Sequence, residues 1–279
     1  MDFRIGLAKG LNTGEKCVAN KRAMITGASS GIGASFARHA GAQGCDIVLV
    51  ARRKEVLAGL AAEIVAAHGV KASVIAADLC SPEAVNSVLS EAGPIDILIN
   101  NAGYSIPPLY EHTLWPQQRA FLEITVMTPA ALVHGVLPGM LERGFGRIIN
   151  VASAAAFSSG AAGHTLYPGG KSFLVKFSQS LSAEVKARGV LVSALSPGFV
   201  QTGFHEANGT SAQMAKAPRH FWQSPEDVVK EAWTRNAKGH EIIVPGLHNK
   251  IAIALLRHLP EAMTQGMVRA QAEKYRVDR

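Results

Sequence analysis

The chain has 279 residues, 48% of them hydrophobic, and a formal net charge of +7 at pH 7. This length and composition predict a large buried core, in one α/β domain or two small domains, and one domain is preferred. The positive charge suits anionic cofactors or acyl carriers. Nucleic-acid binding is not expected, because no cluster of Lys and Arg is interleaved with aromatic residues.

Short apolar runs alternate with longer amphipathic segments, which is typical of parallel βαβ units. Strands are predicted near Arg22–Thr26, Asp46–Ala51, Ala72–Ala77, Ile95–Asn100, Arg147–Ala152, Val190–Ser196 and Glu241–Val244. Helices are predicted at Gly31–Gln43, Lys54–His68, Pro82–Glu91, Pro116–Arg143, Gly170–Arg188 and Pro225–Lys238, with Ser81 and Ser224 as N-caps. The pattern therefore predicts a doubly wound, mainly parallel seven-stranded sheet with helices on both faces, whose ligand site lies beyond the carboxyl ends of the strands.

Residues 21–246 are expected to form this single domain, and residues 1–20 a loose N-terminal extension. That extension lacks the continuous apolar core of a secretory signal or an anchor. No apolar run approaches the ~20 residues of a membrane span, so none is expected. Three cysteines without a Cys-x-x-Cys pair argue against a disulfide framework or a zinc site, and favour a reducing compartment, the cytoplasm.

A glycine-rich turn, Gly27-x-x-x-Gly31-x-Gly33, joins the first predicted strand to the first helix. Glycines there permit a tight turn and let backbone N–H groups approach a pyrophosphate, although such a turn can also be purely structural. The same residues match Gly-x-Ser-x-Gly, the nucleophile elbow of hydrolases, with Ser29 as nucleophile. That alternative is disfavoured, because the elbow would fall on the first strand and leave the later motifs unexplained.

The second predicted strand ends at Ala51 and is followed directly by Arg52 and Arg53, where an NAD site usually has an acidic residue. Two guanidinium groups would attract a 2′-phosphate, so the sequence predicts NADP(H) as the preferred cofactor, with NAD(H) possible. The alternative is a solvated basic pair that opens a helix.

The next two strand ends carry polar side chains as well. Asp78 could accept a hydrogen bond from an adenine amino group, or cap the helix that starts near Pro82. The run Asn100-Asn101-Ala102-Gly103 follows the fourth strand. Its Asn side chains can satisfy loop backbone groups and Gly103 can allow close approach of a cofactor, or the run is an ordinary turn.

Tyr167 and Lys171 are four residues apart and can share a helix face. A free tyrosine has a pKa of about 10, so a nearby ammonium is needed to make the phenolate accessible. Ser153 could donate a second hydrogen bond to a developing alkoxide. Pro168 disfavours helical dihedrals at Tyr167, so the helix is expected to begin just after that residue.

Taken together, these motifs resemble the short-chain dehydrogenase/reductase family over roughly residues 21 to 246. The last of the motifs along the chain is Pro197-Gly198-x-x-x-Thr202. The resemblance implies a Rossmann-type fold and an NADP(H)-dependent oxidoreductase that interconverts a carbonyl and a secondary alcohol. Tyr167 would be the acid/base and Ser153 would orient the substrate oxygen. Lys171 would bind the nicotinamide ribose and lower the pKa of Tyr167, and Thr202 would meet the carboxamide.

The resemblance also implies a set of cofactor-binding residues and an assembly. The set is Gly27, Ser29, Ser30, Gly31, Ile32, Gly33, Arg52, Arg53, Asp78, Leu79, Asn101, Ala102, Gly103, Tyr167, Lys171, Pro197, Gly198, Val200 and Thr202. Family members often assemble through the fifth and sixth helices, so a homodimer or homotetramer is expected.

Thr125 stands where the family usually has a catalytic Asn. Pro129 lies four residues on and cannot donate a hydrogen bond to the Thr125 carbonyl. We hypothesise that this carbonyl holds the water of a proton relay through Lys171, or that Pro129 simply kinks a core helix. The departure leaves a second function open, namely a cofactor-binding regulatory or scaffold protein with an impaired site.

The substrate is the least specified part of the site. Residues 203–222 read as a substrate loop whose Phe204, Met214, Phe221 and Trp222 either favour an apolar substrate portion or only fix the loop. Residues 247–279 are expected to be a C-terminal helical extension, with an amphipathic helix over Leu247–Tyr275. That helix could wall the pocket, pack on a partner or touch a membrane surface.

Overall fold

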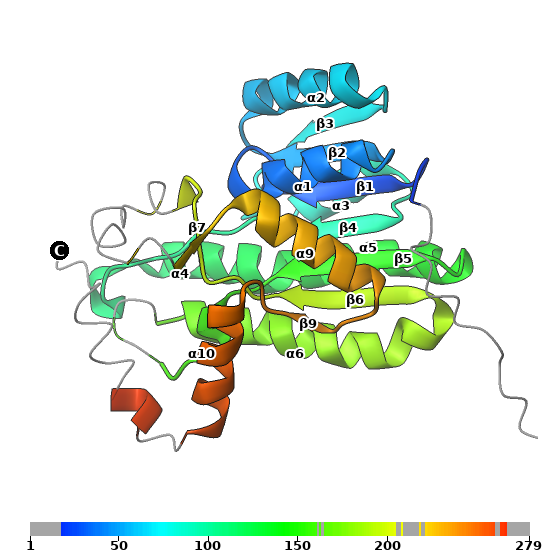
Figure 1. Ribbon diagram of the computed structural model, residues 1–279. Helices are drawn as coiled ribbons and strands as arrows, with labels where there is room; N and C mark the ends of the chain where they lie inside the picture. Colours follow the sequence, from blue (N-terminus) through cyan, green and yellow to red (C-terminus); the bar gives the residue numbers. More distant parts are fainter. Residues whose placement is uncertain are drawn as a thin grey trace, which may run out of the picture.

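Seven parallel strands form one sheet in the order β3-β2-β1-β4-β5-β6-β9 (Figure 1). The computed structural model describes residues 18–160, 162, 165–204, 208, 218, 221–259 and 263–266. The strands are β1 Arg22–Thr26, β2 Asp46–Ala51, β3 Ala72–Ala76, β4 Ile97–Asn100, β5 Gly146–Val151, β6 Val190–Leu195 and β9 Ile242–Ile243. Because the order reverses between β1 and β4, the sheet is doubly wound and the predicted fold class is confirmed.

Helices connect these strands on both faces of the sheet. The α-helices are α1 Gly31–Ala42, α2 Lys54–His68, α3 Ala84–Ala92, α4 Trp115–Leu122, α5 Thr128–Glu142, α6 Tyr167–Val185, α9 Pro225–Ala237 and α10 Leu247–His258. Short 3₁₀ turns are η1 Tyr110–His112, η3 Ala154–Phe157 and η4 Lys186–Arg188, and η2 Glu123–Met127 is a π-helical turn. A small second sheet pairs β7 Phe199–Val200 with β8 Trp222–Gln223.

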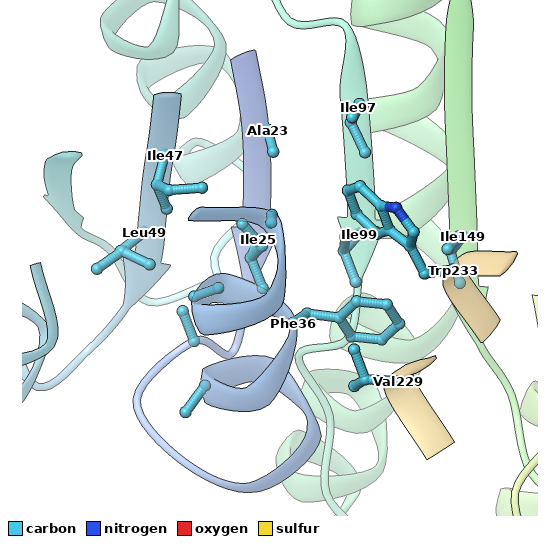
Figure 2. Close-up of a cluster of buried hydrophobic side chains, with 14 of the residues drawn as sticks. Ala23, Ile25, Phe36, Ile47, Leu49, Ile97, Ile99, Ile149, Val229 and Trp233 are labelled. Carbon is cyan, nitrogen blue, oxygen red and sulfur yellow. The ribbon is translucent and has the colours of Figure 1, made fainter. Parts of the chain in front are cut away.

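The core consists of two layers, one on each face of the sheet. Ile25 lies in the layer that contains residues of α1, α2 and α9, whereas its neighbour Met24 lies in the layer that contains residues of α3, α5 and α6. Figure 2 shows the first layer, where Phe36 and Trp233 lie beside strand residues such as Ile99. Since both faces are covered, the strands read as continuous apolar runs, which is why they were predictable.

Two serines that precede prolines behave differently. Ser224 caps α9 as predicted, because its Oγ accepts a hydrogen bond from the Asp227 N–H at 3.1 Å and Pro225 occupies the first turn. The predicted cap at Ser81 is wrong, since α3 begins only at Ala84. The Ser81 hydroxyl instead hydrogen bonds to the carboxylate of Glu83, so these residues form a turn ahead of the helix.

The predicted helix over 116–143 is divided by the π-helical turn η2. The Thr128 N–H donates to the Glu123 carbonyl five residues back, one residue further than in an α-helix. Pro129 has no N–H for the Thr125 carbonyl, and the wider turn ends just before this proline. The helix therefore changes register locally rather than continuing unbroken.

The helical stretch Trp115–Glu142 is the one in the described part of the chain that is long and apolar enough to cross a membrane by length and composition. Leu132, Val133 and Met140 on it are buried in the second core layer. Length and composition do not separate a membrane span from a core helix, and these three residues place one side of the stretch in the core.

The two predicted extensions are described only in part. Of the N-terminal one, residues 1–17 lie outside the described residues, but Val18 is buried in the first core layer and its carbonyl accepts from the Cys45 thiol at 3.4 Å. Of the predicted helix Leu247–Tyr275, α10 covers the first part and residues 263–266 form one helical turn. Residues 260–262 and 267–279 lie outside the described residues.

Candidate active site

The glycine-rich turn joins β1 to α1 at the carboxyl edge of the sheet. Gly27 and Gly31 have φ angles of +63° and +54°, a left-handed conformation that favours glycine. A Cβ at Gly33 would collide with the Gly27 carbonyl oxygen. The N-cap residue Ser30 makes no side-chain capping bond, so the first N–H groups of α1 can serve an anion.

Thr26 fixes the loop after β4 to this turn. Its Oγ1 accepts hydrogen bonds from the N–H groups of Asn101 at 2.9 Å and Ala102 at 3.0 Å. The Asn101 amide donates in return to the carbonyls of Thr26 at 3.0 Å and Gly27 at 3.2 Å. As predicted, an Asn side chain satisfies loop backbone groups. The role of Thr26 was not predicted, although its place at the end of a strand and next to the glycine-rich turn was the available signal.

Arg53 also supports the turn. Its Nη2 donates to the Ser29 Oγ at 2.8 Å and to the Ser29 carbonyl at 3.3 Å, and Arg52 beside it is exposed. A guanidinium stays protonated and cannot act as a general base. The described partner of Ser29 is thus unsuited to activating a nucleophile, which disfavours the hydrolase alternative.

Beyond β3 the chain forms a polar corner that the sequence only partly predicted. The Asp78 Oδ1 accepts from the Cys80 N–H at 3.1 Å, so Asp78 does not cap α3. The carbonyl of buried Leu79 accepts from the Thr128 hydroxyl at 2.9 Å. Burial raises the pKa of Cys80 to about 11 and that of Tyr104 to about 12, which keeps both groups protonated near neutral pH. Tyr104 was not predicted as part of the site.

Ser153, Tyr167 and Lys171 come together where β5 and α6 meet. The Ser153 Oγ caps η3, accepting from the Ala155 N–H at 3.2 Å, and Ser153 also hydrogen bonds to Tyr167. The Lys171 Nζ lies 5.8 Å from the centre of the Tyr167 ring and donates to the Val151 carbonyl at 2.8 Å. A phenol, a hydroxyl and an amine thus converge in a partly buried space.

The electrostatics of this group differ from what the resemblance implies. Burial raises the pKa of Tyr167, and the hydrogen bond from Ser153 opposes this only in part. Burial also lowers the pKa of Lys171 to about 8. In the chain alone, Lys171 therefore does not bring the pKa of Tyr167 below its usual value, because desolvation of the phenolate outweighs the favourable contacts.

Helix α6 begins at Tyr167, three residues earlier than predicted. Pro168 stands in the first turn, where a missing N–H costs nothing because no intrahelical acceptor awaits it. A Cβ at Gly170 would lie 2.9 Å from the Thr125 Cγ2, so glycine lets α6 approach η2 closely.

Thr125 lies in the π-helical turn and is 2% exposed. Its Oγ1 is buried and has no hydrogen-bond partner among the described residues. Asn100 is in a similar position, since its Nδ2 donates to the Asn150 Oδ1 at 2.9 Å while its own Oδ1 is buried without a described partner. Gly103 lies near Lys171, because a Cβ there would be 3.8 Å from the Lys171 Nζ.

The motif after β6 returns to the glycine-rich turn. The Pro197 carbonyl accepts from the Ala154 N–H at 2.8 Å, and Gly198 faces the Asn249 side chain, which a Cβ would strike. Thr202 lies against Gly31, where a Cβ would be 2.9 Å from the Thr202 Cβ. Val200 is buried in β7 between them. Two motifs that are far apart in sequence therefore lie side by side.

A small hollow beside Tyr167 is lined by both apolar and polar side chains. Its other lining residues are Ile106, Pro108, Gln118, Phe121, Thr165 and Leu166. The Phe121 ring lies 6.3 Å from that of Tyr167 and 5.8 Å from that of Tyr104, measured between ring centres.

From the C-terminal part, the Thr264 hydroxyl hydrogen bonds to Ser159 at 3.1 Å.

The aromatic residues of the predicted substrate loop are not gathered in that hollow. Trp222 packs on Phe199, with ring centres 5.5 Å apart, and Phe221 packs edge-on to His248 at 5.7 Å. These contacts support the alternative that the rings fix the loop. Met214 lies outside the described residues, and Phe204 donates its N–H to the Thr202 Oγ1 at 3.3 Å.

Comparison with known proteins gives consistent matches. The family model described as short chain dehydrogenase matches residues 21–213. A short chain dehydrogenase of Pseudocercospora fijiensis is 35% identical over 74% of this chain and 69% of its own length. A very-long-chain 3-oxoacyl-CoA reductase of Anas platyrhynchos is 35% identical over 64% of this chain and 60% of its own. Among solved structures, a short-chain dehydrogenase from Sphingobium yanoikuyae in complex with NADPH superposes with a TM-score of 0.76, at 29% identity over 88% of this chain and 94% of that one.

Proposed function

Since the chain belongs to the short-chain dehydrogenase/reductase family, we propose that it is an NADP(H)-dependent oxidoreductase that interconverts a carbonyl and a secondary alcohol. The observation that supports this most directly is a group of three side chains, of which Lys171 is buried and Ser153 and Tyr167 are half-buried. Tyr167 hydrogen bonds to Ser153, with the Lys171 Nζ 5.8 Å from its ring centre, next to the glycine-rich turn. We assign the catalytic unit to residues 21–246.

In the reducing direction Tyr167 donates its phenolic proton to the substrate oxygen. The raised pKa of Tyr167 suits this role, because it keeps the phenol neutral before the reaction. The Ser153 hydroxyl, held by the Ala155 N–H, donates a second hydrogen bond to the developing alkoxide. When bound, the nicotinamide supplies or accepts the hydride.

The chain's own residues fit a dinucleotide phosphate. The uncapped N-terminus of α1 and the positive-φ glycines suit the pyrophosphate. Arg52 and Arg53 suit a 2′-phosphate, and Arg53 already lies on the turn through Ser29. Thr202 lies against Gly31 of the same turn, where it would meet the carboxamide. A relative solved in complex with NADPH supports NADP(H) as a cofactor, although another neighbour is solved with NAD.

We propose a substrate with an apolar portion. Ile106, Phe121 and Leu166 are apolar side chains beside Tyr167, and contact with them would stabilise an alkyl or ring substituent. The similarity to a very-long-chain 3-oxoacyl-CoA reductase supports an acyl group as one such substituent.

We further propose that Thr125 takes part in a proton relay. The Thr125 carbonyl lacks the N–H of Pro129, and its residue contacts Gly170 beside Lys171, so a water on that carbonyl could reach the amine. A high-resolution structure with cofactor that shows no water within hydrogen-bonding distance of this carbonyl would remove the relay.

The second candidate function is a cofactor-binding regulatory or scaffold protein with an impaired site. The unpartnered Thr125 hydroxyl is the specific observation that favours it, since the usual Asn is absent. Such a protein would bind NADPH but reduce no carbonyl in a broad substrate screen, whereas the enzyme would lose activity on Tyr167→Phe.

We propose a homodimer or homotetramer in the cytoplasm. A groove on the outer side of α5 is lined by His134, Leu137, Pro138, Leu141, Glu142 and Arg188, which offers apolar surface to a second copy. Light scattering on the purified protein tests the assembly, and a monomer at micromolar concentration would contradict it.

The first experiment is titration of the purified protein with NADPH and NADH, followed by nicotinamide fluorescence, for wild type and Arg52→Ala. Tight NADPH binding that weakens selectively in the variant supports the cofactor assignment. Equal affinity for both cofactors would overturn the 2′-phosphate assignment, and no binding to either would overturn the proposed function.

A further inference from the structure

Gln118 lies on the buried face of α4, one turn before Phe121. Gln118 is 4% exposed, and these two residues are the buried ones of this helix. Residues three apart share a helix face, so the Gln118 amide lies on the same side of α4 as the Phe121 ring that contacts Tyr167. Gln118 and Tyr167 both line the small hollow beside the phenol. A buried amide therefore borders the proposed proton donor.

Two linked hydrogen bonds fix which end of this amide faces the hollow. The Thr113 hydroxyl donates its single proton to the Tyr110 carbonyl at 2.6 Å, so its oxygen can only accept from Gln118. The Gln118 Nε2 donates in that contact, at 2.8 Å. Thr113 is not one of the described residues that line the hollow. The nitrogen is thus held on the Thr113 side, and the carbonyl oxygen Oε1 is the polar atom left for the hollow.

The Gln118 Oε1 has no hydrogen-bond partner among the described residues. An amide oxygen removed from bulk water is costly to leave without a donor. None of the described residues that line the hollow has a charged side chain, so a neutral donor fits better than an ammonium group. The hollow has a volume of about 10 Å³, room for about one water-sized group. A hydroxyl group meets these conditions, because it is neutral, donates one hydrogen bond and has the size of a water.

We infer that Gln118 determines substrate specificity, with its Oε1 accepting a hydrogen bond from a hydroxyl that the substrate carries one or two carbons from its carbonyl. The inference rests on the proposed function, because it places that carbonyl at Tyr167, which borders the same hollow. Without substrate, an ordered water can satisfy the oxygen, and a substrate hydroxyl replaces it with an equivalent hydrogen bond. A methyl group in that place leaves the oxygen without a donor, so the site favours the hydroxyketone over its methyl analogue.

The test compares two pairs of ketones that differ only by a hydroxyl in place of a methyl group. The pairs are α-hydroxyacetophenone with propiophenone, and β-hydroxypropiophenone with butyrophenone. For each pair, the ratio of kcat/KM for the hydroxyketone to kcat/KM for its methyl analogue is measured with NADPH. Gln118→Met keeps an unbranched side chain of similar length, and its ratio should be about tenfold lower than that of wild type for at least one pair. The intrinsic reactivities of the ketones cancel in this comparison, because both proteins meet the same substrates.

Gln117→Met is the matched control. Gln117 is the next residue of α4, its Oε1 accepts from the Leu114 N–H at 2.9 Å, and it is not one of the described lining residues. This variant should keep the wild-type ratio. Thr113→Val leaves Gln118 in place but removes the acceptor of its Nε2, so the amide can turn and the ratio should fall by a smaller factor. NADPH titration of every variant checks that the fold is retained.

An unchanged ratio in Gln118→Met for both pairs would overturn the inference and leave the proposed function in place. An equal fall in the Gln117→Met control would do the same. If Gln118→Met does not fold, Thr113→Val decides, and an unchanged ratio there overturns the inference. A wild type that binds NADPH but reduces neither these four ketones nor any carbonyl of a wider panel would contradict the proposed function, and the inference with it. The two failures are therefore distinguishable.

Discussion

The two sides of the candidate site are held together by different interactions. On the cofactor side, Thr26 and Asn101 connect the glycine-rich turn to the loop after β4 through hydrogen bonds to backbone groups. On the substrate side, Tyr104, Phe121 and Tyr167 meet through ring contacts. Hydrogen bonds to the backbone fix one geometry, whereas ring packing tolerates exchange of side chains, so cofactor binding should be sensitive to small changes and substrate choice adaptable.

Tyr167→Phe should produce the largest effect on turnover, because it removes the proposed proton donor, on which reduction of the substrate depends. We expect turnover to fall on the order of 10²- to 10⁴-fold, as for loss of general acid catalysis. NADPH affinity should stay within about threefold of wild type, since the phenol ring remains. The measurement is single-turnover oxidation of NADPH by an apolar ketone. If the Tyr167→Phe variant keeps its activity, another residue is the general acid.

Gly33→Ala tests the cofactor side most severely. Its Cβ would collide with the Gly27 carbonyl oxygen, so the turn must shift, and we expect a loss of about 1–3 kcal/mol in stability together with weakened NADPH binding. The matched control is Gly59→Ala in α2, where a Cβ meets nothing within 4 Å. Chemical denaturation of both variants provides the comparison. If the two variants behave alike, the turn is not as rigid as its packing indicates.

Thr26→Val keeps the shape of the side chain, and we expect its effect on stability to be about as large as that of Gly33→Ala. Two N–H groups, those of Asn101 and Ala102, lose their acceptor, and we expect a cost of about 1–3 kcal/mol in the free energy of unfolding. Isothermal titration should show NADPH binding weakened while KM for the carbonyl substrate changes less. Thr128→Val is a useful comparison, since it removes one bond, to the Leu79 carbonyl.

Leu166→Ala probes the substrate side. It enlarges the hollow next to Tyr167, and we expect kcat/KM for an apolar ketone to fall about tenfold with NADPH affinity unchanged, as for loss of a few methylenes from an apolar pocket. Steady-state kinetics with a series of ketones of increasing size would check this, because larger members should be affected least. An unchanged series would mean that the hollow does not hold the substrate.

The smallest expected effect is on the pH dependence of stability, through His39 in α1. His39 in α1 packs edge-on to Trp233, with ring centres 5.2 Å apart, and burial together with the charges of Arg147 and Lys230 lowers its pKa below 6.5. The unfolded chain then binds the proton more readily than the folded one. Stability is therefore retained above pH 6.5 and decreases as pH falls through the folded-state pKa.

Thermal unfolding of His39→Gln between pH 7.5 and 5 measures this contribution. The variant should lose less stability than wild type over that interval, although it starts lower because the ring contact is gone. Parallel curves for the two proteins would show that His39 does not carry the pH dependence.

The sequence predicted the central strands well and the edges less well. The bounds of β1 and β2 match the prediction because both are buried on both faces, and a continuous apolar run has clear ends. The small β7–β8 sheet was missed, since two-residue strands carry no period. The π-helical turn at Thr125 was missed for another reason: it depends on which acceptor the Thr128 N–H finds, and no periodic pattern in the sequence indicates that acceptor.

The same division applies to the candidate site. Tyr167, Lys171 and the glycine-rich turn were predicted because each has a fixed spacing along the chain. Tyr104 and Gln118 were not, because their proximity to Tyr167 depends on how the loop after β4 folds back over α4. Pro168 was misjudged because local dihedral preference suggested a later helix start, while the helix used the proline in its first turn.

The hydrogen bond between Arg53 and Ser29 matters to anyone who redesigns this protein for a cheaper cofactor. Exchange of both arginines for acidic residues would remove the brace of the glycine-rich turn along with any 2′-phosphate preference. Arg52, which is exposed, can be replaced without touching that brace. An engineering campaign toward NADH should therefore vary position 52 first and leave position 53 until the turn has been stabilised in another way.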